Sequence, residues 1–294
     1  MNERETNSAP NASADELEQN DLVVFPNCPL QLPPAGQLEF LRRQPTAGFG
    51  HKDVSFDPLA GKLGWQRGMH PSEARRLADV LGDFSAAATA WLRANYPIYA
   101  TGLVPDRATL RTEEEATRPL RLTARNDLLH IDTFPTRPTG GRRILRLYVN
   151  IHSIDAHVWA TSDRFPLLLA RYTGRHRVPV RTRAEWMAAA PSVARLFAGR
   201  GRARSAYDAW MLRLHHFLKE DEAFQAQSTR KMWTFPPRSM WLLFSDAVAH
   251  GLLRGRFALD HSFFVDQDCL SRPADSPLTE LERYGRAVAS RRAG

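Results

Sequence analysis

Residues 128–151 read LLHIDTFPTRPTGGRRILRLYVNI, and the second half of this stretch indicates the fold class. From residue 143 to residue 152 apolar and polar side chains alternate, which is typical of a β-strand with two different faces. One face carries Leu145, Leu147, Val149 and Ile151, and the other carries Arg146, Tyr148, Asn150 and His152. Such a strand suits the wall of a barrel that encloses a polar pocket, although a sheet with one wet face gives the same alternation.

The segments around this strand predict a mainly β chain with helices. An amphipathic helix is expected from Ser72, which can cap it, to Asn95. A helical pattern covers residues 181–227, and strand-like segments resume at residues 232–253 and 256–266. This order predicts a double-stranded β-helix (jelly-roll) core with flanking helices and a helical insertion at about 181–227. We expect one domain over residues 23–270, a disordered polar leader over residues 1–22 and a polar C-terminal tail over residues 271–294.

The composition describes a globular chain with an excess of positive charge. The 294 residues include 40 Lys and Arg against 32 Asp and Glu, a net charge of +8, and only four of the cations are lysines. A GC-rich genome alone can produce such an arginine bias. If the charge is functional, it indicates an anionic partner without identifying its kind. No helix-turn-helix, zinc-finger or RNA-binding motif accompanies the cations, and we expect no nucleic-acid partner.

Other patterns narrow the compartment and the chemistry. The sequence shows no membrane-spanning apolar run and no secretory signal, and two cysteines, Cys28 and Cys269, fit a reducing compartment. We therefore expect a cytoplasmic protein. Paired zinc cysteines, a G-x-S-x-G elbow, a glycine-rich phosphate loop and H-E-x-x-H are all missing from the sequence.

Two His-x-Asp pairs occur, and this spacing places both side chains on one face of a strand. His51 follows a loop-like stretch, whereas His130 and Asp132 lie in an apolar, extended one. Two imidazoles and one carboxylate on one face form the ligand set of non-haem Fe(II) oxygenases, which leaves positions for a 2-oxo acid and dioxygen. The third ligand should come from a distant strand, with His250 as the first candidate and His261 as the second.

A 2-oxo acid cosubstrate also requires a cation for its far carboxylate, and arginine offers a two-point fork. Arg146 lies on the polar face of the strand at 143–152 and is the first candidate. Arg256, which follows His250, is the alternative. We expect Arg111, Arg118 and Arg125 near the rim of the site.

Three segments of the chain resemble the Kdo hydroxylases, bacterial oxygenases that use iron(II) and 2-oxoglutarate to hydroxylate carbon 3 of 3-deoxy-D-manno-oct-2-ulosonic acid (Kdo) in lipopolysaccharide. They are residues 128–151, residues 211–219 (MLRLHHFLK) and residues 235–264 (FPPRSMWLLFSDAVAHGLLRGRFALDHSFF). The central motif H-x-D-x-F-P-x-R-P-T-x-G-x-R-I-L-R is far more specific than His-x-Asp alone, and the likeness runs from about residue 22 to residue 266.

The resemblance implies a jelly-roll fold and a ligand set. Iron would be held by His130, Asp132 and His250, and the cosubstrate would be contacted by Arg146, Arg111 and Trp159. The chain departs from the family pattern at two positions. His157 stands where arginine is expected before Val158-Trp159, and Arg238 stands where the turn after Pro236-Pro237 normally has glycine.

The resemblance therefore predicts a dioxygenase that hydroxylates carbon 3 of Kdo in Kdo-lipid A, with Fe(II), 2-oxoglutarate and ascorbate as a candidate accessory cofactor. The substrate would be presented at the cytoplasmic face of the inner membrane, where peripheral contact suits a positive surface. His215 and Lys219 are candidates for a substrate wall. Two alternatives stay open: a JmjC-like hydroxylase of a protein or nucleic acid, and a non-catalytic anion-binding domain in which His130 and Asp132 are a core pair.

Overall fold

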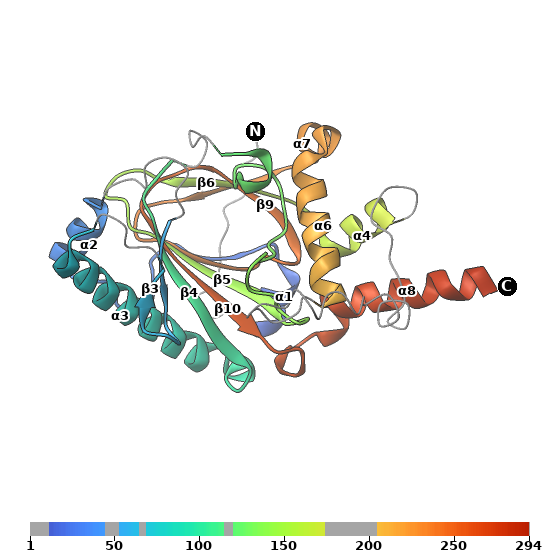
Figure 1. Ribbon diagram of the computed structural model, residues 1–294, viewed down its shortest axis with the longest axis horizontal. Coiled ribbons are helices and arrows are strands. Elements are labelled where there is room, and N and C mark those ends of the chain that lie inside the picture. The colour runs from blue at the N-terminus through green and yellow to red at the C-terminus, as the bar shows by residue number, and fades with distance from the viewer. Residues whose placement is uncertain (1–11, 45–52, 65–68, 115–119, 174–204, 294) are drawn as a thin grey trace, which may run out of the picture.

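The computed structural model describes residues 12–44, 53–64, 69–114, 120–173 and 205–293. In these residues two antiparallel sheets face each other, and helices cover them from outside (Figure 1). The larger sheet has the order β1-β8-β5-β10-β4-β2-β3 and the smaller sheet the order β7-β6-β9. The prediction of a mainly β jelly roll with flanking helices is confirmed.

The elements have the following bounds. The larger sheet contains β1 (Val23–Phe25), β2 (Val54–Asp57), β3 (Lys62–Leu63), β4 (Leu103–Arg111), β5 (Arg143–Asn150), β8 (Met240–Phe244) and β10 (Ala258–Val265). The smaller sheet contains β6 (His157–Arg164), β7 (Lys231–Phe235) and β9 (Val248–Arg254). The α-helices are α1 (Ala14–Gln19), α2 (Ala35–Arg42), α3 (Pro71–Asn95), α4 (Phe165–Thr173), α6 (Ala206–Glu220), α7 (Glu222–Gln227) and α8 (Pro277–Ala293), and a short 3-10 turn, η3, spans Leu122–Ala124.

The larger sheet buries its outer face under α2 and α3 (Figure 1). The apolar residues of β5 point into this core, as the alternation predicts, and α3 adds buried residues at helical spacing: Leu77, Val80, Leu81, Phe84, Ala88 and Leu92. Each large apolar side chain buried here contributes about 1.5–3 kcal/mol. All residues of β5 are buried, so its polar face is enclosed and does not meet bulk water.

The start of α3 differs from the prediction by two residues. His70 is the N-cap, and its Nδ1 accepts a hydrogen bond from the backbone N–H of Ser72 at 3.3 Å. Pro71 follows at the first helical position, where its fixed φ suits the helix and its missing N–H costs nothing. The imidazole therefore takes the capping role that we expected of Ser72.

The expected disordered leader is wrong for residues 12–22. Ser13 and Glu16 form a capping box that starts α1, and Leu17 is fully buried. The buried Glu18 carboxylate accepts hydrogen bonds from the Tyr99 hydroxyl at 2.8 Å and from the backbone N–H groups of residues 271 and 272 at 2.8 and 2.7 Å. These contacts give a polar segment fixed partners that only the folded chain supplies. The expected tail likewise contains α8, which extends away from the body (Figure 1).

An aromatic stack packs the two sheets together. Trp241 on β8 stacks on Phe235 of β7 with ring centroids 3.9 Å apart, and on Tyr148 of β5 at 5.4 Å. Contacts of this kind add about 0.5–1.5 kcal/mol beyond the burial of the rings. They hold the sheets at a fixed separation and leave space for a cavity.

The part of the expected helical insertion at residues 205–227 forms α6 and α7, and residues 174–204 lie outside the described residues. Asp208 anchors α6, because its carboxylate accepts hydrogen bonds from the backbone N–H groups of Thr139 and Gly140 at 2.7 and 3.0 Å. On the opposite side of the helix from this anchor the apolar residues pack toward α4, where Trp210 meets Phe165 at 5.9 Å. The helix therefore stands in a defined position at one side of the space between the sheets (Figure 1).

Candidate active site

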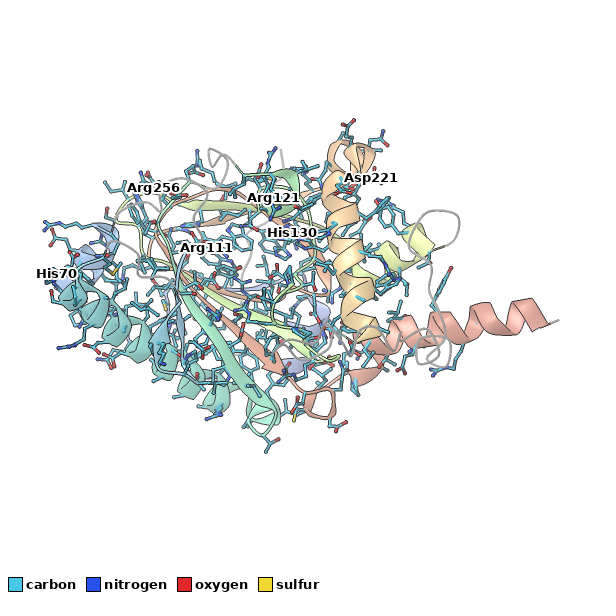
Figure 2. All side chains as sticks on the ribbon, in the orientation of Figure 1. His70, Arg111, Arg121, His130, Asp221 and Arg256 are labelled. Atoms are coloured by element: carbon cyan, nitrogen blue, oxygen red, sulfur yellow. The ribbon has the colours of Figure 1, made fainter. Side chains whose placement is uncertain are left out.

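A cavity of about 680 Å³ lies between the two sheets, with α6 and η3 along its sides. The larger sheet contributes side chains from β4, β5 and β10, and the smaller sheet contributes them from β6 and β9. In Figure 2 the labelled Arg111 and His130 lie between the sheets. The polar face of β5 lines this space through Arg146 and Tyr148, as the barrel-wall interpretation predicts.

The segment that carries His130 lies against β9. His130 and His250 exchange two backbone hydrogen bonds, at 3.0 and 2.8 Å, and form an antiparallel bridge. Gly251 makes this approach possible, because a Cβ atom at this position would lie 3.0 Å from the carbonyl oxygen of Asp127. Residues 120 positions apart in the chain are thereby placed side by side.

Three side chains converge in the cavity: His130, Asp132 and His250, whose potential ligand atoms lie within 4.8 Å of one another. Asp132 Oδ1 is 3.5 Å from Nε2 of His130 and 3.9 Å from Nε2 of His250. Each Nδ1–H donates to a backbone carbonyl, of Leu128 at 2.7 Å and of Val248 at 3.0 Å. These hydrogen bonds fix the tautomer, so that both Nε2 lone pairs point toward the carboxylate, as metal-ligating histidines require.

The protonation states also suit a cation. Burial lowers the pKa of His130 and of His250, and the Lys219 ammonium lowers that of His130 further. Burial alone would raise the pKa of Asp132, but the Arg146 guanidinium beside it holds this pKa well below its usual range. Two neutral imidazoles and one carboxylate therefore coexist at neutral pH, which is the donor set that Fe(II) takes in facial-triad sites.

Behind the triad, buried charges form a chain of ion pairs. The two terminal nitrogens of Arg146 donate to Asp132 at 2.8 Å and to Asp260 at 2.6 Å. Asp260 also accepts from Arg111 Nε at 2.7 Å, and Arg111 lies 3.5 Å from Asp53. Burial disfavours the Arg146 charge, but Asp260 and Asp132 raise its pKa above the usual value. Arg146 thus holds the second oxygen of Asp132 and orients the first toward the histidines.

Three buried donors on residues that line the cavity have no acceptor among the described residues: Arg137 Nε, Arg146 Nε and Trp159 Nε1. The Trp159 indole stacks on the His250 ring with centroids 5.9 Å apart, and Tyr148 packs edge-on against it at 4.7 Å. Leaving a buried donor unsatisfied costs about 1–3 kcal/mol. The unsatisfied N–H groups fit a ligand that brings carboxylate oxygens, which is what the prediction of Arg146 and Trp159 as cosubstrate contacts requires.

The α6 wall carries the residues that we expected to face a substrate. His215 donates from Nδ1 to the carbonyl oxygen of Ile131 at 2.6 Å, and its ring lies 5.2 Å from that of His130. Burial and the neighbouring Lys219 lower the pKa of His215 to about 4, so its Nε2 is an acceptor at neutral pH. Lys219 is 3% exposed and donates to the Thr123 carbonyl oxygen at 3.2 Å. Both side chains line the cavity.

Several predicted candidates lie elsewhere. His261 faces the α3 side of β10, where its Nε2 accepts from the Ser85 hydroxyl at 2.7 Å, so it is not the third ligand. Arg256 donates to the Thr112 carbonyl oxygen and stands over Phe257, away from the cavity lining. Arg125 pairs with Asp127. The other two, His51 and Arg118, lie outside the described residues.

The two departures from the family pattern have physical accounts. His157 is buried and donates from Nε2 to the Arg256 carbonyl oxygen at 2.9 Å, and burial lowers its pKa to about 4. It is therefore neutral and does not replace an arginine as an anion contact. Arg238 has φ +67°, the left-handed conformation that glycine adopts without strain. The turn keeps its shape, at the expense of a strained arginine.

Sequence reasoning missed Asp260, and with it Ser262 and Arg107. The alternation of residues 258–265 contains the signal, because Asp260 and Ser262 share the face opposite to His261. In the register of β10 and β5, Asp260 is opposite Tyr148 and Ser262 is opposite Arg146. The sequence analysis considered His261 as a ligand and did not consider the adjacent Asp260.

A facial triad inside a double-stranded β-helix defines the class of protein: the non-haem iron, 2-oxoglutarate-dependent oxygenases. Residues 1–287 match the model of the 3-deoxy-D-manno-oct-2-ulosonic acid (Kdo) hydroxylase family, and the chain belongs to this family. The match includes the leader and most of the tail, which the resemblance in sequence did not reach.

Solved structures agree with this assignment. The chain is similar to the Kdo hydroxylase KdoO in complex with cobalt(II), at 29% identity and a TM-score of 0.78, over 94% of this chain and 93% of that chain. It is similar to KdoO in complex with alphaketoglutarate and Fe(III), at 29% identity and a TM-score of 0.77, over 93% and 92% of the two chains. A comparison with curated proteins gives no match.

Proposed function

We propose that this chain is an Fe(II)- and 2-oxoglutarate-dependent dioxygenase that hydroxylates carbon 3 of Kdo in Kdo-lipid A. The observation that carries the proposal is the convergence of His130, Asp132 and His250 in a chain of the Kdo hydroxylase family. KdoO, to which the chain is similar over nearly its whole length, binds Fe(III) with alphaketoglutarate and with succinate. Ascorbate would act only as an accessory reductant.

The residues of the cavity have separable tasks in this reaction. His130, Asp132 and His250 would hold the iron, which would supply the activation of dioxygen. Overall, one oxygen atom would be inserted into a substrate C–H bond and the other would enter succinate as carbon dioxide leaves. Arg146 lines the cavity and its Nε–H has no acceptor among the described residues, so this guanidinium would hold the far carboxylate of 2-oxoglutarate. Arg111 supports it through the shared Asp260, and Trp159 adds an indole N–H and a flat wall beside His250.

We also propose that the protein works in the cytoplasm with peripheral contact to the inner-membrane surface. Lipid A phosphates and the Kdo carboxylate are anionic, which suits a chain with a net charge of +8. None of the helices in the described part of the chain has the length and apolar character needed to cross a membrane.

The test is turnover by the purified protein with Fe(II), 2-oxoglutarate and Kdo-lipid A. We expect succinate release coupled to a mass gain of one oxygen on the glycolipid, and loss of both in His250→Ala. Arg283→Gln on the exposed surface of α8 is the matched control and should behave as the parent protein. A mass gain only on a peptide or nucleic acid would instead support the JmjC-like alternative. Absence of metal binding would support the anion-binding domain.

A further inference from the structure

The cavity carries more positive charge than iron and 2-oxoglutarate require. Among the described residues six cationic side chains line it against three carboxylates: Arg107, Arg111, Arg121, Arg137, Arg146 and Lys219 against Asp53, Asp132 and Asp260. A divalent cation and a dianionic cosubstrate cancel each other, so the excess remains. An excess of one sign inside a cavity favours a substrate of the opposite sign.

Arg107 and Arg137 form ion pairs with other carboxylates than those that Arg146 holds. Arg107 on β4 donates to the Ser55 hydroxyl at 3.2 Å and lies 4.0 Å from Asp57. Arg137 lies 3.3 Å from Asp106. Both arginines line the cavity, and their side chains are partly exposed, Arg107 at 32% and Arg137 at 26%. Burial lowers the pKa of Arg137, and the charge of the nearby Arg107 lowers it further. Two cations that line the same cavity can together form a site for an anionic oxygen group.

Arg137 is also held in a fixed orientation. Its guanidinium stands 4.3 Å from the centre of the Phe134 ring, and its backbone N–H donates to the Phe134 carbonyl oxygen at 3.2 Å. Its Nε–H has no acceptor among the described residues. Arg137 follows Asp132 by five residues, and both side chains line the cavity.

The chemistry of the proposed substrate places an anion close to the metal site. The carboxylate of Kdo is attached to carbon 2, so only two bonds separate its carbon from carbon 3. When carbon 3 faces the metal, the carboxylate must meet a wall close to the triad. Arg146 is paired with two carboxylates, Asp132 and Asp260. Arg137 and Arg107 are each paired with one.

We propose that Arg137 and Arg107 together bind an anionic oxygen group of the substrate, a carboxylate or a phosphate, and so determine substrate specificity. The inference rests on the proposed function. In this arrangement Arg146 and Arg111 bind the cosubstrate, whereas Arg137 and Arg107 bind the substrate.

The test compares the KM for the glycolipid with the KM for 2-oxoglutarate. Arg137→Gln alone would leave the buried Asp106 unpaired, so the main variant is Asp106→Asn with Arg137→Gln, which removes both charges. We expect the glycolipid KM to rise on the order of 10- to 100-fold, the effect of losing one or two charge-assisted hydrogen bonds, while the KM for 2-oxoglutarate stays constant. Arg137→Lys should recover part of the loss, and Arg283→Gln should show none.

Two modified substrates identify the anion. Kdo-lipid A with its carboxylate as a methyl ester should lose affinity for the parent protein but not for the double variant if the carboxylate is bound. Kdo-lipid A without phosphates should show this pattern if a phosphate is bound. An unchanged glycolipid KM in the double variant, or an equal rise in both KM values, would overturn the proposal.

A binding measurement separates failure of this inference from failure of the proposed function. Calorimetric titration of cobalt(II)-loaded protein with Kdo-lipid A, which carries both the carboxylate and the phosphates, requires no turnover. Weaker binding by the double variant supports the arginine pair even if the parent protein oxidises no glycolipid. Equal binding by both proteins contradicts it.

Discussion

Acidification from pH 7 to pH 5 is expected to destabilise the fold through two buried histidines, His157 and His261. Both are essentially unexposed, and each has a ring nitrogen that donates to a backbone carbonyl, of Arg256 and of Ser262, both at 2.9 Å. Burial lowers the pKa of each imidazole from 6.5 to about 4. Between these two values the unfolded chain binds protons that the folded chain excludes.

The magnitude follows from proton linkage. A lowered pKa in the folded state gives stability that is fully present above pH 6.5 and is lost as the pH falls toward 4. At about 1.36 kcal/mol per pH unit, each histidine forfeits roughly 2 kcal/mol by pH 5, and the two together roughly 4 kcal/mol. That is a large fraction of a typical free energy of unfolding of about 5–15 kcal/mol.

Urea denaturation of metal-free protein at pH 7.5 and pH 5.0 measures the effect. The comparison variant is His157→Gln, whose side-chain amide can still donate to the Arg256 carbonyl oxygen but does not titrate. The parent protein should lose about 2 kcal/mol more than this variant over the interval, because all other groups titrate equally in both. Equal losses in the two proteins would refute the reasoning.

Three further predictions concern the backbone and the buried charges. Gly251→Ala should weaken cobalt(II) binding by about tenfold in a metal titration, because the new Cβ would lie 3.0 Å from the Asp127 carbonyl oxygen and displace the metal-ligand segment. Gly36→Ala is the control, because a Cβ at this position meets open space, and it should leave the cobalt(II) affinity unchanged. Arg238→Gly should raise the free energy of unfolding by about 1 kcal/mol through relief of the left-handed strain, and an unchanged Tm would contradict this. Asp260→Asn should cost about 3–5 kcal/mol in urea denaturation, because two buried arginines lose their shared carboxylate, and a loss below 1 kcal/mol would show that the pairs are dispensable.

Local pattern was sufficient for those parts of the molecule that depend on neighbours in the chain. The alternation at residues 143–152 correctly assigned Arg146 and Tyr148 to the cavity and Leu145 to the core, because the two faces of a strand follow from its backbone alone. The spacing of His130 and Asp132 assigned both to one side for the same reason. The strand-like segment after Pro236-Pro237 made His250 the first candidate for the third ligand and His261 the second, and the resemblance to the Kdo hydroxylases implied His250 as well.

Contacts between distant segments explain what the sequence did not reveal. The leader was expected to be disordered because its composition is polar, yet Glu18 finds its hydrogen-bond donors at Tyr99 and residues 271–272. Asp260 was overlooked because its importance comes from two arginines on neighbouring strands.

The sequence by itself determined the class of fold, the metal-ligand types and the face of the strand on which they lie. The tertiary structure alone decided that His250 would meet His130, through a backbone bridge that Gly251 permits, and that Arg146 would be shared between Asp132 and Asp260. The physical reason is that the first set of features depends on interactions between neighbours in the chain and the second on contacts between distant segments. Side-chain direction is set by the dihedral angles of each residue, whereas the register between strands is set by packing over the whole sheet, and only that register brings charges from distant strands within hydrogen-bonding distance.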